Sequence, residues 1–281
     1  MEKIALITDS TCGLPKEYAD RYQVHVLSLK IIYKDREYID GVDISPEQVY
    51  ERLEEEVPTT SMPSVEDAEK LFEKLIQEGY THAVALPISS GLSGTINSFR
   101  IAADHYKDKI ESFILDTKML SMAVGLSVIE IGKAIQAGKN FKEICELAYQ
   151  LRDKTTLYFT VDTLEYLIKG GRIGRVSGGI GQLLNIKPII TMDEEGKYTT
   201  VTKVRGSKQT LNKLIQMGKE IVDNAKSKVV IMTGTMHKEA ELLKEAFIDH
   251  PNTTFLYEGT ITPVVGIHSG PKLLALVIMK E

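Results

Sequence analysis

Short apolar runs and longer amphipathic stretches alternate along the first half of the chain. The apolar runs have the length of buried strands, and they cover residues 4–7, 24–33, 83–88 and 113–115. Apolar positions three or four residues apart predict helices over residues 15–22, 64–79, 118–137 and 141–152, and another that begins near Ser93. Strands and helices that alternate in this way form a parallel sheet through right-handed crossovers. The pattern predicts a three-layer α/β/α domain over residues 1–156.

Two of the helix starts carry a local signal of their own. Residues 45–48 (S-P-E-Q) and 64–67 (S-V-E-D) each place a serine three residues before a side chain that can bond back to the backbone. This arrangement is a capping box, and proline at the first helical position supports the first of the two. We therefore expect helices to begin directly after Ser45 and Ser64.

The pattern changes after about residue 157. The segments L-Y-F-T-V, I-K-P-I-I-T-M and K-Y-T-T-V-T-K-V are typical of strands, and the short turn E-E-G between the last two predicts a hairpin. Helical patterns follow at 207–225 and 237–248, with strands at 229–232 and 273–279. The second half is therefore predicted to be an α/β domain with a mixed sheet, over residues 157–281. Clefts between domains are favoured binding sites.

Composition and charge exclude several classes of function. The chain has 281 residues, 43% of them hydrophobic, with a net charge of −5 and a pI near 5.8, so a general nucleic-acid-binding surface is not expected. No apolar run approaches the ~20 residues of a membrane span, and the apolar run near the N-terminus is too short for a secretory signal. We expect a cytoplasmic protein with no integral membrane association, whose Cys12 and Cys145 are free thiols.

The familiar cofactor and metal motifs are absent. The sequence has no phosphate-binding G-x-x-x-x-G-K-[ST] loop and no H-E-x-x-H, and its six histidines are scattered. The glycine-rich segment at 169–175 lacks the spacing of a dinucleotide-binding loop. We therefore expect no metal and no cofactor.

The richest candidate for chemistry is the segment 88–95, I-S-S-G-L-S-G-T. It follows a predicted buried strand and leads into a helix, which is where open α/β sheets bind ligands. Backbone N–H groups and hydroxyls at a helix start can hold an anion. An ordinary serine cap would explain one of these serines but not the whole run, so a ligand-binding role is the stronger interpretation.

Three further segments carry candidate residues. In T-S-M-P-S at 60–64 the last serine can cap a helix, whereas Thr60 and Ser61 are not needed for capping. His268 lies in the shaped loop G-I-H-S-G-P, where a structural or a binding role is equally plausible. Arg172, Arg175 and Arg205 are either solvated surface arginines or contacts to phosphate or an acidic partner.

Whether Ser93 is a nucleophile is open on these residues alone. Ser93, either Asp116 or Asp162, and His268 follow the chain order of a hydrolase triad. However, Thr95 stands where the nucleophile elbow G-x-S-x-G needs its last glycine. A nucleophile needs one serine and one base, whereas several neutral hydroxyls suit a carboxylate held by hydrogen bonds. A serine esterase or thioesterase that uses Ser93 and His268 is the alternative to a carboxylate-binding site.

Together these segments resemble the DegV family of bacterial fatty-acid-binding proteins. The resemblance runs nearly end to end, and its specificity comes from the order and spacing of the motifs. They are I-T-D-S-T at 7–11, D-G-V-D-I-S at 40–45, T-S-M-P-S at 60–64, I-S-S-G-L-S-G-T at 88–95, V-D-T-L-E-Y-L-I-K-G-G-R-I-G at 161–174, K-V-R at 203–205 and G-I-H-S-G-P at 266–271.

The resemblance implies two α/β domains that hold a long-chain fatty acid, such as palmitate, stearate or oleate, in a buried tunnel. By position in the motifs, Thr60, Ser93 and His268 correspond to residues that grip the carboxylate. Second contacts correspond to Ser61, Ser90 and Gly91. The family pattern also implies a non-catalytic carrier that presents the acid to a separate, ATP-using fatty-acid kinase for acyl-phosphate formation in phospholipid synthesis. Arg172 and Arg205 match arginines that dock this kinase.

Two residues depart from the family pattern. Met62 replaces the usual glutamine and could alter the pocket wall, and Lys272 replaces the usual glycine in the last loop. Neither is a presumed carboxylate donor. Candidate tunnel-wall residues are apolar and could equally be ordinary core; they include Leu164, Leu167, Ile168, Ile180, Leu183 and Leu184.

Overall fold

The computed structural model describes residues 2–176 and 185–281. Within these ranges the chain forms two compact units, Met1–Asp43 with Thr60–Asp153, and Ile44–Thr59 with Lys154–Glu281. The sequence suggested a single boundary at 156/157, whereas residues 44–59 group with the second unit. This segment contains α2 (Pro46–Arg52), which packs against α10 (Pro263–Ser269).

The first unit is built on a four-stranded parallel sheet with the order β2-β1-β6-β7. Its strands are β1 (Ile4–Asp9), β2 (His25–Leu27), β6 (His82–Leu86) and β7 (Glu111–Ile114). The helices are α1 (Lys16–Arg21), α3 (Val65–Gln77), α4 (Thr95–His105), α5 (Met122–Gln136) and α6 (Phe141–Lys154), with the short 3-10 helix η1 (Ser10–Cys12). A smaller sheet has the order β4-β3-β5 and consists of β3 (Lys30–Ile32), β4 (Glu37–Ile39) and β5 (Thr59–Ser61).

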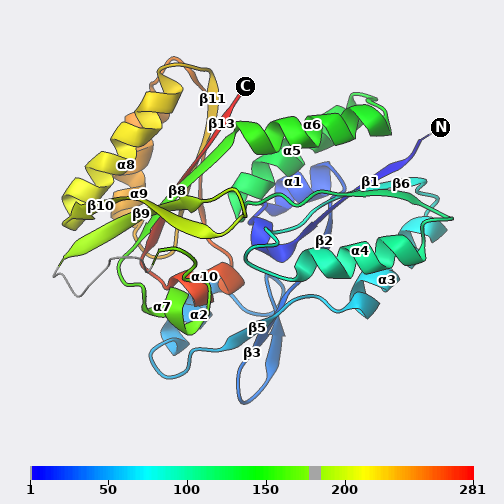
Figure 1. Ribbon diagram of the computed structural model, residues 1–281, viewed down its shortest axis with the longest axis horizontal. Coiled ribbons are helices and arrows are strands. Elements are labelled where there is room, and N and C mark those ends of the chain that lie inside the picture. The colour runs from blue at the N-terminus through cyan, green and yellow to red at the C-terminus, as the bar shows by residue number, and fades with distance from the viewer. Residues whose placement is uncertain (1, 177–184) are drawn as a thin grey trace. The chain divides into compact units, whose positions relative to one another are not determined.

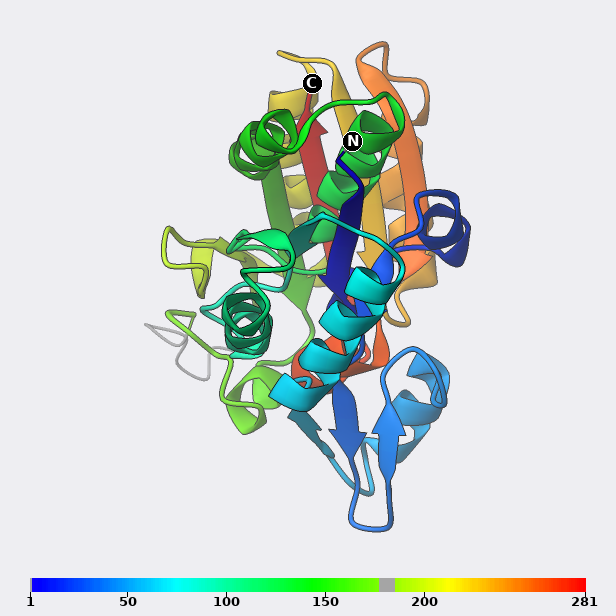
Figure 2. The same cartoon turned by 90° about the vertical axis from the view of Figure 1, so that its right-hand side faces the viewer.

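Helices cover both faces of the parallel sheet. On one face α3 and α4 lie side by side (Figure 2), and the fully buried Phe72 and Phe99 pack against Ala5, Ala83 and neighbouring strand residues. On the other face α5 contacts β1, and Tyr149 of α6 meets Phe113 of β7 edge to face. The predicted three-layer α/β/α arrangement with a parallel sheet is confirmed.

The helices largely follow the predicted pattern, with one informative difference. Both capping boxes are present, because Ser45 and Ser64 accept hydrogen bonds from Gln48 N and Asp67 N. The helix expected from residue 118 instead begins at Met122. Lys118 and Ser121 have φ angles of 53° and 54°, which are incompatible with a right-handed helix, so residues 117–121 form a loop.

The second unit contains a six-stranded mixed sheet with the order β10-β9-β8-β13-β11-β12. The strands are β8 (Thr155–Val161), β9 (Ile186–Met192), β10 (Tyr198–Arg205), β11 (Ser227–Thr233), β12 (Thr253–Thr260) and β13 (Leu273–Lys280). The predicted hairpin is confirmed, since β9 and β10 pair antiparallel. The pair β11–β12 is parallel and the other pairs are antiparallel, as a mixed sheet requires.

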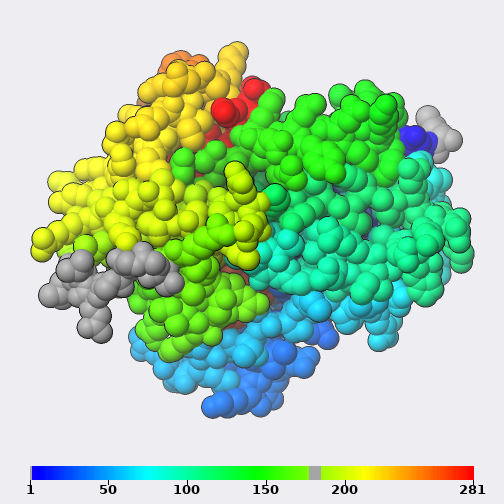
Figure 3. Space-filling model, in the orientation of Figure 1, coloured from blue at the N-terminus to red at the C-terminus, as the bar shows by residue number. Residues whose placement is uncertain are grey.

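Two long helices cover one face of this sheet. They are α8 (Ser207–Val222) and α9 (His237–Ile248), and Leu214 and Phe247 from them pack on Ile231, Leu276 and their neighbours (Figure 1). The outer side of α8 lies on the surface, coloured yellow in Figure 3. Three short helices also belong to the described part of this unit, α2, α7 (Glu165–Lys169) and α10, and α10 contacts both of the others.

Candidate functional site

The carboxyl ends of β1 and β6 are joined by a buried aspartate. The two strands pair in parallel, with Thr8 opposite Leu86, so both end at the same edge of the sheet. Asp9 follows Thr8 and is fully buried. Its Oδ2 accepts a hydrogen bond from Ile88 N at 2.7 Å, and its Oδ1 accepts from Thr11 N at 2.9 Å and Thr11 Oγ1 at 2.5 Å. Asp9 therefore holds the start of the 88–95 segment against the end of β1.

A second aspartate holds the middle of the same segment. Asp116 follows β7, and its Oδ1 accepts from Ser90 N at 3.1 Å while its Oδ2 accepts from the Ser90 hydroxyl at 2.5 Å. Ser90 is exposed and lies at the rim of the loop, whereas Asp9 is buried. Burial is the main reason that the pKa of Asp9 is raised. The Ser90 hydroxyl thus donates to Asp116 in this structure, so Ser90 supports the shape of the loop.

Between these anchors the chain makes a tight turn into α4. Ser89 O accepts from both Leu92 N and Ser93 N at 3.1 Å, and Gly91 N donates to Ser89 Oγ at 3.1 Å. Gly94 stands at the N-cap of α4 and offers no side-chain cap. The half-buried Ser93 hydroxyl accepts from Thr95 N at 3.3 Å. Ser93 consequently sits at the positive end of the helix dipole, which favours a bound negative charge.

The partners of Ser93 bear on its possible role as a nucleophile. Its Oγ is hydrogen-bonded to Thr95 Oγ1 at 2.8 Å, with either atom as donor. A threonine hydroxyl cannot act as the general base that activates a serine. His268, the base of the hydrolase alternative, belongs to the other unit.

The segment that carries Thr60 and Ser61 lies beside the Ser93 loop. Ser98 of α4 donates its hydroxyl to Pro63 O at 2.7 Å. A Cβ added to Gly94 would lie 2.9 Å from Met62 Sδ, so Met62, at the position of the first departure from the family pattern, rests directly on the loop. Ser64 is used as the cap of α3. The structure therefore brings the two hydroxyl-rich segments of the first unit together.

Within this segment the candidate donors differ in their surroundings. Thr60 and Ser61 are half-buried at the end of β5, and the Ser61 hydroxyl donates to Met62 O at 3.1 Å. Met62 keeps 45% of its surface exposed. The Ser61 hydroxyl is therefore engaged with the neighbouring backbone in this structure.

The second unit places His268 next to Arg172. His268 lies on α10 and is half-buried, and burial together with the charge of Arg172 lowers its pKa to about 4. Arg172 follows α7, and its Nη1 donates to Gly170 O at 2.5 Å. His268 is therefore neutral near pH 7, and it can offer a hydrogen bond but no full charge.

The two arginines considered for partner docking lie on different elements. Arg172 is half-buried in the turn after α7, whereas Arg205 is exposed at the end of β10, opposite Ile186. Gly206, which follows Arg205, forms the N-cap of α8 with φ of 87°. Arg175 pairs with Glu195 at 2.6 Å, so it serves the β9–β10 hairpin.

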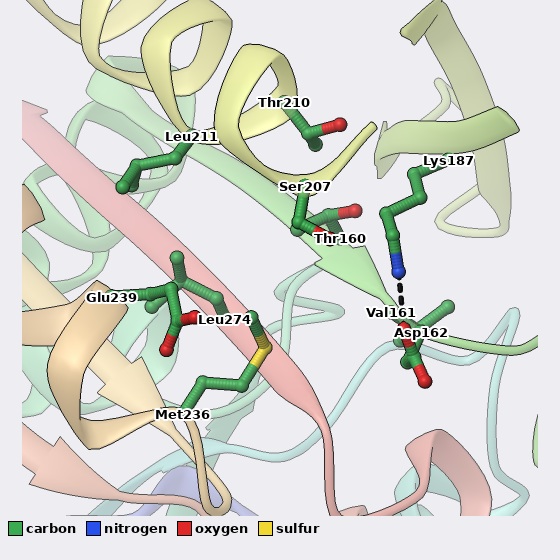
Figure 4. Close-up of a pocket in the computed structure, with 10 residues that line it drawn as sticks. All are labelled: Thr160, Val161, Asp162, Lys187, Ser207, Thr210, Leu211, Met236, Glu239 and Leu274. Carbon is green, nitrogen blue, oxygen red and sulfur yellow. Dashed lines mark hydrogen bonds and ion pairs between the residues drawn. The ribbon is translucent and has the colours of Figure 1, made fainter. Parts of the chain in front are cut away.

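A small pocket of the second unit includes Asp162, the alternative triad acid, in its lining (Figure 4). The other lining residues belong to β8, β9, α8, α9 and β13, together with Met236 at the N-cap of α9. Lys187 is ion-paired with Asp162, and Lys272, the other departure from the family pattern, lies 3.5 Å from the second carboxylate oxygen. Lysine pairing lowers the pKa of Asp162. Asp162 thus has a structural partner, which weakens its place in a hydrolase triad.

The sequence did not predict that two aspartates organise the loop. Asp116 was considered only as the acid of a hydrolase triad and Asp9 only as part of the I-T-D-S-T motif, whereas both accept hydrogen bonds from the 88–95 segment. The signal that could have found them is an aspartate directly after a buried apolar run, where loops from neighbouring parallel strands meet. The role of Gly170 beside His268 could not be read from sequence, because α7 and α10 are distant along the chain.

The tunnel-wall candidates are only partly described. Leu167 is buried, Leu164 is half-buried, and Ile168 is 60% exposed. Ile180, Leu183 and Leu184 lie outside the described residues. Among the three described candidates, Leu167 is therefore the one that is buried as a tunnel-wall or core residue should be.

Residues 2–176 and 185–281 contain no group of three or more histidine, cysteine, aspartate or glutamate side chains that could hold a metal ion. In the same ranges, none of the helices combines the length and apolar character needed to cross a membrane.

Comparisons with known proteins agree on one family. A family profile described as "Uncharacterised protein, DegV family" matches residues 3–281. A DegV domain-containing protein of Clostridium acetobutylicum is 48% identical over 281 residues, covering 100% of both chains. Two solved structures named for fatty acid binding are also similar. One is a DegV family protein of Thermus thermophilus, with a TM-score of 0.93, 26% identity and coverage of 99% of this chain and 100% of that one.

The second of these solved structures is a stearic-acid-binding protein of Eubacterium ventriosum. Its TM-score is 0.85 and its identity 26%, with coverage of 100% of this chain and 98% of that one. The likeness thus extends over the whole sequence and both units. The motifs, the sheet topologies and these comparisons together show that the chain belongs to the DegV family.

Proposed function

We propose that this protein binds a long-chain fatty acid and that Thr60 and Ser93 donate hydrogen bonds to its carboxylate. The observation that carries the proposal is the Ser93 loop, which places neutral hydroxyls at the positive end of α4, where Gly94 offers no side-chain cap and the Ser93 hydroxyl accepts from Thr95 N. The names of the related structures, which refer to fatty acid and stearic acid, support the class of ligand. Ser61, Ser90 and Gly91 are proposed as second contacts to the headgroup, and His268 as a further hydrogen-bonding residue.

The charge pattern suits a carboxylate better than a phosphate dianion. Hydroxyl and backbone N–H donors of the loop are neutral, and the anion is favoured by the helix dipole. His268 is neutral near pH 7 because its pKa is about 4. A site with neutral donors can hold a single negative charge without a paired lysine or arginine, since hydrogen bonds to a charged acceptor are worth about 1.5–3 kcal/mol each.

The acyl chain supplies most of the affinity in this proposal. A buried methylene contributes about 0.8 kcal/mol, so ~14 of them give roughly 11 kcal/mol before costs. Loss of translational freedom and ordering of the chain consume much of this sum. Tight binding and co-purification with a host fatty acid are the expected result.

The proposal assigns the chemical step to a partner. The chain presents the bound carboxylate to a cytoplasmic fatty-acid kinase, which forms the acyl-phosphate for phospholipid synthesis, and Arg172 and Arg205 contact this kinase. Arg205 is exposed and Arg172 half-buried, so both are accessible to some degree. No catalytic step is assigned to this chain.

Native mass spectrometry of the purified protein, followed by lipid identification, tests ligand binding. We expect a one-to-one adduct with the mass of a C14–C18 fatty acid. The variant Ser93→Ala should bind stearate at least about tenfold more weakly, because one hydrogen bond to the carboxylate is lost. Ser112→Ala is the matched control, since Ser112 lies on β7 in the same unit and its hydroxyl makes a weak bond to Ile110 O at 3.4 Å.

Each failure has a separate meaning. A protein that stays empty after incubation with fatty acids would refute the carrier function. Labelling of Ser93 by a fluorophosphonate probe would support the esterase alternative instead. Arg172→Ala should keep the lipid but reduce acyl-phosphate formation with the kinase, and loss of the lipid would place Arg172 in the pocket.

A further inference from the structure

Gly170 is not required by its own backbone conformation. It ends α7 with φ of −77° and ψ of −8°, a region that any residue adopts. The next residue, Gly171, has φ of 70°, so that position favours glycine for conformational reasons. A different cause must explain why position 170 has no side chain.

The cause is the ring of His268. A Cβ built on Gly170 would overlap His268 Nδ1 and lie 3.1 Å from His268 Cε1. The next nearest atom is Tyr166 O, also at 3.1 Å. A matching contact is made by the glycine that ends α10. A Cβ on Gly270 would overlap the ring of Tyr166 from α7. α7 and α10 thus cross at two glycines, each of which accommodates a ring of the other segment.

The same glycine also holds the neighbouring arginine. Arg172 Nη1 donates to Gly170 O at 2.5 Å, and Arg172 N donates to Leu167 O at 2.9 Å. The guanidinium is therefore fixed to the peptide that packs against His268. Its positive charge adds to the effect of burial in keeping that histidine neutral.

We propose that Gly170 is a positioning residue that sets two functional side chains at once. Its missing side chain leaves room for the His268 ring, and its carbonyl oxygen holds the Arg172 guanidinium. The ligand-binding histidine and the partner-docking arginine thereby share one support. This inference rests on the proposed function for the roles of His268 and Arg172, whereas the packing relation between Gly170 and His268 stands without it.

Gly170→Ala tests the positioning role, with Gly171→Ala as the matched control. Alanine at 170 is compatible with the backbone and displaces the His268 ring, whereas a Cβ at 171 meets nothing within 4 Å and only strains the turn. Stearate affinity should fall at least about tenfold in Gly170→Ala, to the level of His268→Ala. Gly171→Ala should lower stability but keep the affinity, and equal losses of affinity in both variants would overturn the proposal.

A double-mutant cycle on stability tests the packing relation independently of any ligand. Gly170→Ala should lower the unfolding midpoint in the parent protein and have little effect in the His268→Ala background, where the ring is gone. If Gly170→Ala alone does not fold, the double variant Gly170→Ala/His268→Ala should fold, and this recovery tests the same packing relation. Equal losses of stability in both backgrounds would refute the positioning role, and failure of fatty-acid binding with a positive cycle would refute only the proposed function.

NMR titration of His268 adds a readout that a purely structural role would not change. Titratable side chains that lie against α10 include Tyr166 from α7 and Tyr50 from α2, and the charge of Arg172 acts on His268. Replacing Arg172 with methionine should raise the His268 pKa, because a nearby positive charge is removed. Gly170→Ala should also shift it, by moving the ring and releasing the arginine. An unchanged pKa in both variants would contradict the shared support.

Discussion

Replacing Asp9 with asparagine tests how the first unit holds its ligand loop. The carboxylate accepts three hydrogen bonds, two from Thr11 and one from Ile88 N. Asparagine keeps the shape but replaces one acceptor oxygen with an NH₂ donor. If its oxygen faces Thr11, the Ile88 N–H loses its acceptor at the point where the 88–95 segment begins. If the amide is flipped, both Thr11 donors lose theirs.

Two opposing effects decide the size of the change. A buried donor left without a partner costs about 1–3 kcal/mol. Against this, asparagine removes a buried charge, and burial is the main reason that the pKa of Asp9 is raised. Three donors already point at the carboxylate, so we expect the lost bonds to dominate. Asp9→Asn should lower the free energy of unfolding by about 1–3 kcal/mol near pH 7.

The raised pKa also fixes the sign of the pH dependence. The folded state takes up a proton on Asp9 at a higher pH than the unfolded chain, whose aspartates titrate near about 3.9. The stabilisation due to this protonation is therefore complete below the pKa that Asp9 has in the unfolded chain. It is lost as pH rises through the pKa that Asp9 has in the folded protein. The stability gap between the parent protein and Asp9→Asn should accordingly widen as pH falls from neutrality.

Urea unfolding followed by far-UV circular dichroism at several pH values measures both quantities, since the chain has no tryptophan for fluorescence. Asp20→Asn is the control, because Asp20 forms an exposed pair with Lys16 that contributes little. If Asp9→Asn unfolds like Asp20→Asn, the three bonds do not hold the loop. If the gap narrows as pH falls, hydrogen bonding outweighs burial at this carboxyl group and the reasoning is wrong.

Two further predictions concern the first unit. Burial raises the pKa of Cys12 to about 12 and that of Cys145 to about 11, so neither thiol should react with iodoacetamide at pH 8 until the protein is unfolded. Mass spectrometry of native and denatured samples measures this, and fast native labelling of Cys12 would show that the 3-10 helix η1 opens readily. Gly132→Ala should destabilise the unit by about 1–3 kcal/mol, because the new Cβ would lie 2.7 Å from Tyr22 Cβ on the packed face of α5. Thermal unfolding checks it, and an unchanged midpoint would mean that Tyr22 moves aside without cost.

Much of the architecture was predictable because it is encoded locally. Capping boxes mark the starts of α2 and α3, and the short turn between β9 and β10 predicts their hairpin. Alternation of strands and helices indicates the parallel sheet of the first unit. In each case the deciding interactions join residues close in sequence, or follow a periodicity that only one type of element satisfies.

Other elements were missed for equally physical reasons. α7 and α10 have five and seven residues, too few to show a helical period. β12 is an edge strand of mixed exposure, so its sequence does not alternate clearly between apolar and polar positions. The loop in front of α5 depends on left-handed conformations at Lys118 and Ser121, which their residue types do not favour.

The candidate site divides in the same way. By itself the sequence determined the hydroxyl-rich segments around Thr60 and Ser93, the glycine-flanked His268 and the family to which they belong. Only the tertiary structure decided which groups support them. Asp9 reaches Ile88 across 79 residues, and Ser98 reaches Pro63 across 35. Likewise, Gly170 makes room for His268 because two short helices cross there. Contacts of this kind leave no periodic trace, because each depends on the distance between segments that the fold alone brings together.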